Sequence, residues 1–129
     1  MEISVSTSAP IEVVDVTERV EGAVGDDVES GVATVFVSHT TAAVVVNEAE
    51  PRLVEDVEEF VAGLVPDDRR YRHDEIDDNA AAHLRATLLG ESVAVPIEDG
   101  RLALGTWQSI LFVECDGPRS RTLSVTVTA

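Results

Sequence analysis

Three histidines are the side chains best suited to chemistry in this sequence. His39 follows an apolar run, His73 precedes a helical segment, and His83 stands one helical turn after Asn79. Neutral imidazoles bind divalent metals and act as general acids or bases. No local metal motif such as HExxH occurs, so a three-histidine metal site requires all of them to converge. The alternative is scattered surface or capping histidines.

More polar side chains stand at the ends of two apolar runs. His39-Thr40-Thr41 follows the run 31–38, and Asn47-Glu48 ends the run 42–46. Hydrogen-bonding groups at the margin of a dry sheet indicate a binding site. Alternatively, the threonines pair across strands and Asn47-Glu48 opens the next helix.

The segment Gly100 to Gln108 contains the only tryptophan. Trp107 lies between Thr106 and Gln108, where one predicted strand ends and the next begins. A large aromatic with polar neighbours can form the wall of a ligand pocket. Alternatively, Trp107 plugs the end of a barrel or sandwich while Thr106 and Gln108 satisfy backbone groups.

Charge excludes several classes of function. The 129 residues contain 25 acidic against nine basic residues, a net charge of −16, and all nine basic residues are arginine. Without lysine there is no Schiff-base or P-loop chemistry. A strongly negative field repels phosphate backbones, so we expect no nucleic-acid partner. Such acidity is typical of a protein adapted to concentrated salt, and we expect a halophilic source.

The length and apolar pattern predict one soluble domain, residues 1–129. A single cysteine, Cys115, excludes an internal disulfide and suits a reducing compartment. We interpret it as a buried small side chain rather than a nucleophile. No stretch has the length of a membrane span and the start of the chain has no signal-peptide pattern, so we expect a cytoplasmic protein without membrane contact.

Periodicity predicts a mixture of strands and helices. The run 31–38 is β-branched and nearly continuous, which indicates a central strand buried on both faces. Helix 51–64 begins at Pro51, and a second helix runs from about Asn79 to residue 89. The turn Glu98-Asp99-Gly100 predicts a hairpin. The other expected strands are 2–8, 11–20, 42–46, 92–97, 101–104, 109–114 and 122–128, with 71–73 extended and either a loop or a short helix from residue 21 to 27.

Two apolar stripes are expected to bury the helices. They are Leu53, Val57, Phe60, Val61 and Leu64 on the first helix, and Leu84 and Leu88 on the second.

Several fragments, in order along the chain, resemble the YjbQ family. They are Ser38-His-Thr-Thr41, Asn47-Glu48, Tyr71-Arg-His73, Asp78-Asn79, Ala82-His83-Leu84, Gly100-Arg-Leu-Ala-Leu-Gly-Thr-Trp-Gln108 and Glu114-Cys-Asp-Gly-Pro-Arg-Ser-Arg121. The resemblance implies a compact α+β fold, a two-sheet β-sandwich with two helices, and assembly as a homotrimer. The family's motif histidines fall on His39, His73 and His83.

The resemblance also implies a function. The family is linked to a secondary thiamine-phosphate synthase activity, in which a pyrimidine-methyl diphosphate and a thiazole phosphate join with release of pyrophosphate. A divalent metal, zinc or magnesium, would assist and would be held by the three histidines. On this view the catalytic residues are His39, Glu48, His83 and Arg119, and the substrate-binding residues are Asn47, Tyr71, Asn79, Thr106, Trp107, Gln108 and Arg121.

Other functions remain open at this stage. The chain has no diphosphate motif, and its negative field opposes the binding of a small phosphorylated metabolite. A non-catalytic trimer that binds a metabolite or metal is the alternative to an enzyme. A third hypothesis gives the polar fragments a purely structural role at subunit interfaces.

Overall fold

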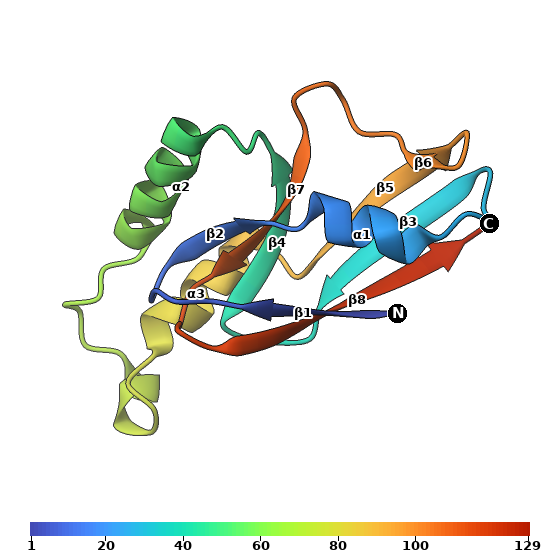
Figure 1. Ribbon diagram of the computed structural model, residues 1–129. Coiled ribbons are helices and arrows are strands. Elements are labelled where there is room, and N and C mark those ends of the chain that lie inside the picture. The colour runs from blue at the N-terminus through green and yellow to red at the C-terminus, as the bar shows by residue number, and fades with distance from the viewer.

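Two antiparallel β-sheets form the framework of the computed structural model, which describes all of residues 1–129 (Figure 1). The five-stranded sheet has the order β1-β8-β3-β5-β6, and the three-stranded sheet has the order β2-β7-β4. The strands are β1 Glu2–Ser6, β2 Glu12–Asp15, β3 Gly31–Val37, β4 Ala42–Asn47, β5 Ser92–Glu98, β6 Arg101–Leu102, β7 Ser109–Glu114 and β8 Ser120–Thr128. The helices are α1 Thr17–Val24, α2 Pro51–Leu64 and α3 Ala80–Leu89, with a 3-10 turn, η1, at Arg72–Glu75.

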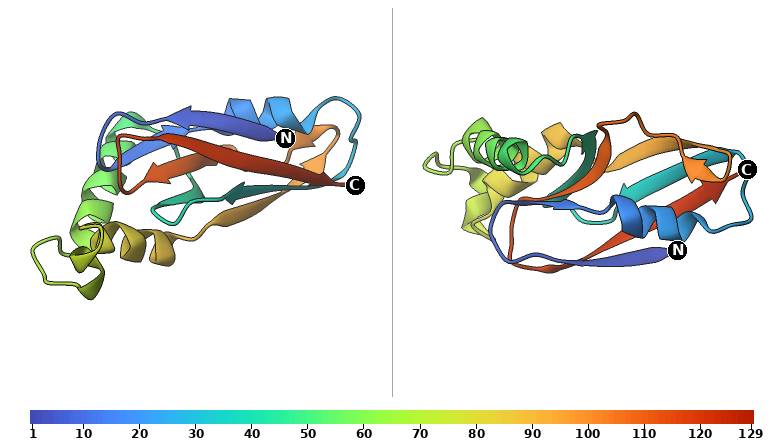
Figure 2. Two further views of the ribbon diagram at one scale, coloured as in Figure 1. Left: turned by 90° about the horizontal axis from the view of Figure 1, so that it is seen from below. Right: turned by 45° about the horizontal axis from the view of Figure 1, so that its top comes forward.

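The side chains of β7 alternate between two hydrophobic cores. Ile110 and Phe112 face the larger core, which lies between the two sheets and includes the buried side of α1. Leu111 and Val113 face a smaller core beneath α2 and α3. The three-stranded sheet is therefore the middle layer, with the five-stranded sheet on one side and α2 and α3 on the other. These two helices gather toward one end of the molecule (Figure 2).

Most expected elements are confirmed. The hairpin between β5 and β6 turns at Asp99 and Gly100, whose φ angles of 51° and 76° match the left-handed geometry that an Asp-Gly turn favours. Helix α2 begins at Pro51, as predicted, and α3 ends where the Gly90 N–H donates to the Ala86 carbonyl. The fold is α+β with two sheets, as expected, but it has three α-helices rather than two.

The additional helix replaces part of a predicted strand. The segment 11–20 was expected to be one strand, but β2 spans only Glu12–Asp15, and α1 begins at Thr17. The Asp15 carboxylate accepts hydrogen bonds from the Thr17 N–H at 2.9 Å and its hydroxyl at 2.6 Å. These local bonds compete with strand pairing and start the helix, so the strand prediction was wrong beyond residue 15.

The exposed surfaces correct three further expectations. Strand β3 is central, but Val32 and Phe36 are 40% and 44% exposed, so only one face is buried. Neither residue belongs to one of the two hydrophobic cores, so this face of the sheet points away from them. Phe60 of α2 and Leu88 of α3, both expected in buried stripes, are 63% and 67% exposed. Residues 72–75 form η1 rather than an extended segment.

Small residues explain how α3 packs. Its buried positions are Ala80, Ala81, Ala82, Arg85 and Ala86, not the leucines Leu84 and Leu88. Alanines allow the helix backbone to approach β4 closely, and the leucines are left on the outer side. None of the helices has the length and apolarity required to cross a membrane.

The net charge of −16 predicts a salt-dependent stability. Raising KCl from about 0.1 M to about 1 M shortens the Debye length from about 10 Å to about 3 Å, so repulsion among carboxylates should weaken and the melting temperature should rise. The measurement is thermal unfolding followed by circular dichroism.

A charge variant controls for other effects of salt. Glu55 and Glu59 are exposed and one helical turn apart on α2, so Glu55→Gln with Glu59→Gln removes a repulsive pair. This variant should melt higher than the parent in low salt, and the difference should close in high salt. A difference that is independent of salt contradicts the electrostatic explanation.

Candidate functional site

A buried ion pair joins the two sheets at one end of the sandwich. Glu114, on β7, is 0% exposed and lies on the same side of its strand as Phe112. Arg121, on β8 of the other sheet, is 5% exposed. Its Nε donates to Glu114 Oε1 at 2.9 Å, and one of its terminal nitrogens donates to Oε2. Because such a bidentate pair has a defined geometry, it fixes the relative orientation of the two sheets and the distance between them at this end.

Other groups bond to both carboxylate oxygens of Glu114 and to Arg121. The Thr7 hydroxyl donates to Glu114 Oε1 at 2.8 Å and the Asp116 N–H donates to Oε2 at 3.0 Å. Arg121 donates to the Thr41 hydroxyl at 2.9 Å. Burial alone would raise the pKa of Glu114, but these hydrogen bonds, led by that from Arg121, outweigh it and hold the pKa below its ordinary value. Glu114 therefore stays ionised.

The backbone at Gly117 passes very close to the ion pair. A Cβ at this position would overlap the Ala9 carbonyl oxygen and lie 2.8 Å from Glu114 Cγ and 3.0 Å from the Thr7 hydroxyl. Only glycine fits here without moving the chain that carries Thr7.

His39 is oriented by the strand that carries Arg121. The Thr122 backbone N–H donates to His39 Nε2 at 2.9 Å. Burial, and then the nearby positive charge of Arg121, lower the pKa of His39 below its ordinary value of 6.5. His39 is therefore neutral near pH 7. Because Nε2 accepts this hydrogen bond, the single ring proton of the neutral imidazole is on Nδ1. His39 Nδ1 is therefore a hydrogen-bond donor.

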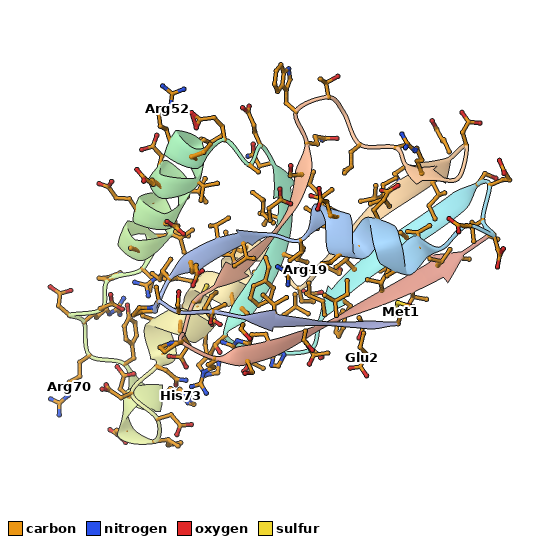
Figure 3. All side chains as sticks on the ribbon, in the orientation of Figure 1. Met1, Glu2, Arg19, Arg52, Arg70 and His73 are labelled. Atoms are coloured by element: carbon orange, nitrogen blue, oxygen red, sulfur yellow. The ribbon has the colours of Figure 1, made fainter.

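His39 and His83 line one pocket, here named the histidine pocket. It is open to solvent, has a volume of about 300 Å³, and is lined by His39, Thr40, Ala42, His83, Ala86, Thr87 and Glu91. His73 lies behind His83, and the two rings pack edge to face with centroids 4.7 Å apart. Figure 3 shows His73 beside the start of α3. The three histidines thus gather in one neighbourhood, although His73 does not line the pocket.

The histidines differ in how well they fit a metal ion. Nε2 of His73 is buried without a hydrogen-bond partner, which suits a ligand atom. Nε2 of His39 is occupied by Thr122, and its Nδ1 carries a proton, which does not suit one. No three His, Cys, Asp or Glu side chains are arranged to hold a metal together. The bond from Thr122 to His39 thus counts against a site shared by all three histidines, and metal binding by His39, His73 and His83 stays a prediction.

Asp116 organises a cluster next to the histidines. It accepts hydrogen bonds from Asn79 Nδ2 at 3.0 Å and from an Arg119 terminal nitrogen at 2.9 Å. Burial works to raise the pKa of Asp116, but these two bonds lower it overall. Arg119 is half-exposed, and its Nε donates to the Asp116 carbonyl at 2.9 Å. Its guanidinium is thus aimed by Asp116 while remaining accessible to a ligand.

Other predicted site residues lie at the opposite end of β4. Asn47 pairs with Ser109 there, whereas Ala42, next to the histidine pocket, pairs with Glu114. The strand has six residues, so the ends are roughly 17 Å apart from a rise of about 3.4 Å per residue. In Figure 3, His73 and Arg52, at the start of α2, likewise lie far apart. The residues of this distal end are Asn47, Glu48, Thr106, Trp107 and Gln108.

Trp107 fits neither interpretation made from the sequence. It is 73% exposed on the loop from β6 to β7, so within one chain it neither plugs the sandwich nor forms a pocket wall. Gln108 Oε1 accepts the Gly105 N–H at 2.8 Å and shapes this loop.

Tyr71 and Cys115 line a second cavity of about 300 Å³. The Tyr71 hydroxyl donates to the Pro66 carbonyl at 2.7 Å. Burial, and then the charge of Glu114, raise the pKa of the Cys115 thiol to about 11. Cys115 therefore stays protonated, which agrees with its interpretation as a buried small side chain.

The sequence did not reveal how Glu114 and Arg121 are used. Arg121 was expected to bind substrate, but its Nε and one terminal nitrogen are engaged by Glu114 and Thr41, so the geometry favours a positioning role; substrate binding stays a prediction. The available signal was a single carboxylate at the end of the apolar run 110–113 and a single arginine beside the apolar alternation of β8. Neither signal predicts that Glu114 and Arg121 form an ion pair with each other.

Comparison with known proteins shows what the chain is similar to. All of residues 1–129 match the family described as UPF0047 protein YjbQ-like. A UPF0047 protein from Archaeoglobus fulgidus is 51% identical over 97% of this chain and 98% of its own length. Another, from Methanothermobacter thermautotrophicus, is 46% identical over 98% and 89%, respectively.

A solved structure has the same fold. It is a crystal structure, described as a YbjQ-like protein of unknown function, from Sulfolobus solfataricus. It superposes with a TM-score of 0.94 at 43% identity, covering 98% of this chain and 94% of that one. The organisms of these three relatives are diverse and do not support the expectation of a halophilic source.

The close approach at Gly117 predicts the effect of a methyl group. Gly117→Ala should lower the free energy of unfolding by about 1–3 kcal/mol, because Ala9 or Glu114 must shift. Chemical denaturation measures the change. Gly63→Ala is the control, since a Cβ at Gly63 in α2 meets nothing within 4 Å and should stabilise by about 0.5–1 kcal/mol. Equal effects at the two glycines would show that the end of the sandwich is not tightly packed.

The bond from Thr122 predicts the tautomer of His39. Nitrogen-15 NMR of the imidazoles at neutral pH should show His39 protonated on Nδ1, with a pKa below 6.5. His73→Gln and His83→Gln assign the signals. Since the unfolded chain binds the proton more tightly, this group lowers stability as the pH falls from about 6.5 to the folded-state pKa. A proton on Nε2, or a pKa above 6.5, contradicts the geometry.

Proposed function

The chain belongs to the UPF0047 YjbQ-like family, and from that premise we propose that it is an enzyme acting on a small phosphorylated metabolite at the histidine pocket. The observation that carries the proposal is the state of His39. This ring is neutral, anchored at Nε2 by Thr122, and shares an open pocket with His83. A donor fixed before the ligand arrives costs no reorganisation during reaction, which is the arrangement that stabilises developing negative charge.

We propose a thiamine-phosphate synthase reaction, as a primary or secondary activity. The thiazole nitrogen forms a bond to the methylene carbon of the pyrimidine-methyl diphosphate. The carbon–oxygen bond to the diphosphate breaks, and its electron pair leaves with pyrophosphate. The attacking ring nitrogen carries no proton, so this step needs no general base. It needs donors around the departing diphosphate, and His39 is such a donor.

The other candidate residues near the histidine pocket also have proposed roles. Arg119, aimed by Asp116 and accessible, binds a phosphate oxygen. His83 lines the same pocket as His39 and is proposed to contact the substrate. Glu114 and Arg121 are positioning residues, because they hold the strand whose Thr122 anchors His39. Asn79 and Tyr71 are proposed to contact substrate from the neighbouring cavity.

A divalent metal, zinc or magnesium, is proposed on His73 and His83. Nε2 of His73 lacks a hydrogen-bond partner and lies 4.0 Å from the Asp77 carboxylate, and the ring contacts His83, which supports this placement. When bound, the ion would neutralise charge on a departing diphosphate. His39 is outside this proposed metal site and acts through its Nδ1–H.

A homotrimer is proposed because the candidate residues fall at two distant ends of β4. A second copy could bring Asn47, Glu48, Thr106, Trp107 and Gln108 to the histidine pocket. The outer face of the five-stranded sheet, with Val32 and Phe36 exposed, offers an apolar surface for such contacts. The assembly is proposed to be cytoplasmic, without nucleic-acid or membrane partners.

Removal of the His39 donor tests the enzyme proposal. Gln can accept the Thr122 N–H in place of Nε2 but cannot supply the Nδ1–H, so His39→Gln should lower turnover of the two phosphorylated substrates by about 10²–10³-fold. Thr87→Ala is the matched control, because this pocket residue spends its hydroxyl on the His83 carbonyl at 2.8 Å. Its turnover should stay near the parent's.

The same samples test the assembly and the metal. Light scattering should give a trimer for the parent and for His39→Gln, and elemental analysis of protein without a histidine tag should show metal that is lost in His73→Gln with His83→Gln. Ligand binding without turnover in the parent supports instead a non-catalytic trimeric metabolite- or metal-binding protein. Unchanged turnover in His39→Gln overturns the role of His39. Dissociation of the trimer in that variant supports the structural hypothesis.

A further inference from the structure

Each free edge of the two sheets receives a hydrogen bond from outside its sheet. The edge strands are β1 and β6 in the five-stranded sheet, and β2 and β4 in the three-stranded sheet. Such edges carry unpaired N–H and C=O groups, to which a strand of another chain can bind. The Gly90 carbonyl accepts the Val44 N–H of β4 at 3.2 Å, and the Glu58 carboxylate of α2 accepts the Val13 N–H of β2 at 2.8 Å.

Helix α1 bonds to both edges of the five-stranded sheet. An Arg19 terminal nitrogen donates to the Ser4 carbonyl of β1 at 3.1 Å. The Glu21 carboxylate accepts the Leu102 N–H of β6, with both oxygens at 3.3 Å. Residues two positions apart in an α-helix point to roughly opposite sides, which agrees with the position of α1 between these edges (Figure 1). Figure 3 shows Arg19 between α1 and β1.

The pairing of β1 with β8 shows which backbone groups of β1 face outward. Met1 exchanges two hydrogen bonds with Val125, and the Thr7 N–H donates to the Arg119 carbonyl. Because bonded and non-bonded residues alternate along an antiparallel pair, the odd-numbered residues of β1 bond to β8. The backbone groups that point away from β8 are those of Glu2, Ser4 and Ser6.

The sequence of β1 suits pairing with β1 of a second copy. Antiparallel pairing centred on Ser4 places Ile3 opposite Val5, and Glu2 opposite Ser6. Apolar side chains then face each other on the buried side of the strand, and no like charges are opposed. In this pairing each Ser4 N–H donates to the Ser4 carbonyl of the other copy. That carbonyl is the atom to which Arg19 already donates.

From this register we propose that Arg19 is a guard residue, which keeps β1 from pairing with β1 of a second copy. It occupies the central acceptor of the outward row, so the other strand loses the bonds on which the pairing is centred. The net charge of −16 also keeps copies apart, but salt screens that repulsion. The guard is therefore needed most at high ionic strength. This inference does not rest on the reaction or the trimer proposed above.

Removal of the guanidinium tests the guard. Arg19→Met keeps an apolar stem on α1 but removes the donor to Ser4. In about 1 M KCl, where charge repulsion is screened, light scattering at rising protein concentration should give a mass at least about twice that of the parent. Arg101→Met is the matched control, because it makes the same charge change at an exposed arginine of β6. Its mass should equal the parent's.

A proline locates the new contact. Ser4→Pro removes an outward N–H without removing a bond to β8, which is the position where an edge strand tolerates proline. Adding Ser4→Pro to Arg19→Met should return the mass to that of the parent. Hydrogen exchange gives a second measurement. As the concentration rises, the Ser4 amide should exchange at least about tenfold more slowly in Arg19→Met, and at an unchanged rate in the parent.

Three results overturn the inference: a mass of Arg19→Met that equals the parent's at every concentration; an equal gain in Arg101→Met, which indicates a general effect of lost positive charge; or a gain that Ser4→Pro does not reverse, which indicates contact elsewhere. If the variant with Ser4→Pro fails to fold, exchange of the Ser4 amide in Arg19→Met decides. Masses are compared with the parent in whatever assembly it forms, so this test and the turnover test of His39 fail separately.

Discussion

The Glu114–Arg121 ion pair is the constraint on which the rest of the candidate site depends. One partner comes from the three-stranded sheet and the other from the five-stranded sheet, and both are buried. Burying two charges is costly unless every oxygen and proton finds a partner. Thr7, Thr41 and the Asp116 backbone supply such partners, so this one pair fixes the loop after β1, the start of β4 and the turn before β8.

The chemistry of the site follows from that framework. Arg121 brings β8 to the place where the Thr122 N–H meets His39, and its charge helps to keep the imidazole neutral. The negative charge of Glu114 partly offsets the effect of Arg121 on the pKa of His39. A neutral donor histidine, His39, and an accessible arginine, Arg119, both lie at this end of the sandwich, in a chain of net charge −16. These donors make this end of the sandwich the most favourable place for an anionic substrate to bind.

The sequence predicted local features well where a few adjacent residues decide them. The turn at Asp99-Gly100 and the start of α2 at Pro51 are set by backbone preferences of those residues. The buried faces of the helices were harder. Leu88 of α3 was expected inside, but the alanines of that helix pack more closely against the sheet, and an apolar stripe cannot reveal which of two apolar faces is covered.

Contacts between segments that are far apart in the chain could not be predicted from the sequence. The gathering of the three histidines was an open question, and the bond from Thr122 that decides the tautomer of His39 joins residues 83 positions apart. The separation of Trp107 from His39 by the length of β4 was equally invisible, because motif order along the chain does not measure distance in the fold.

A double-mutant cycle tests the central role of the ion pair most directly. Unfolding free energies would be measured by chemical denaturation for Glu114→Gln, Arg121→Met and the double variant. Each single variant leaves one buried partner uncompensated and should lose about 3–5 kcal/mol, whereas the double variant removes both charges and should lose much less than the sum. Losses that add to within about 0.5 kcal/mol would mean that the two residues act independently, and the account of the site would be wrong.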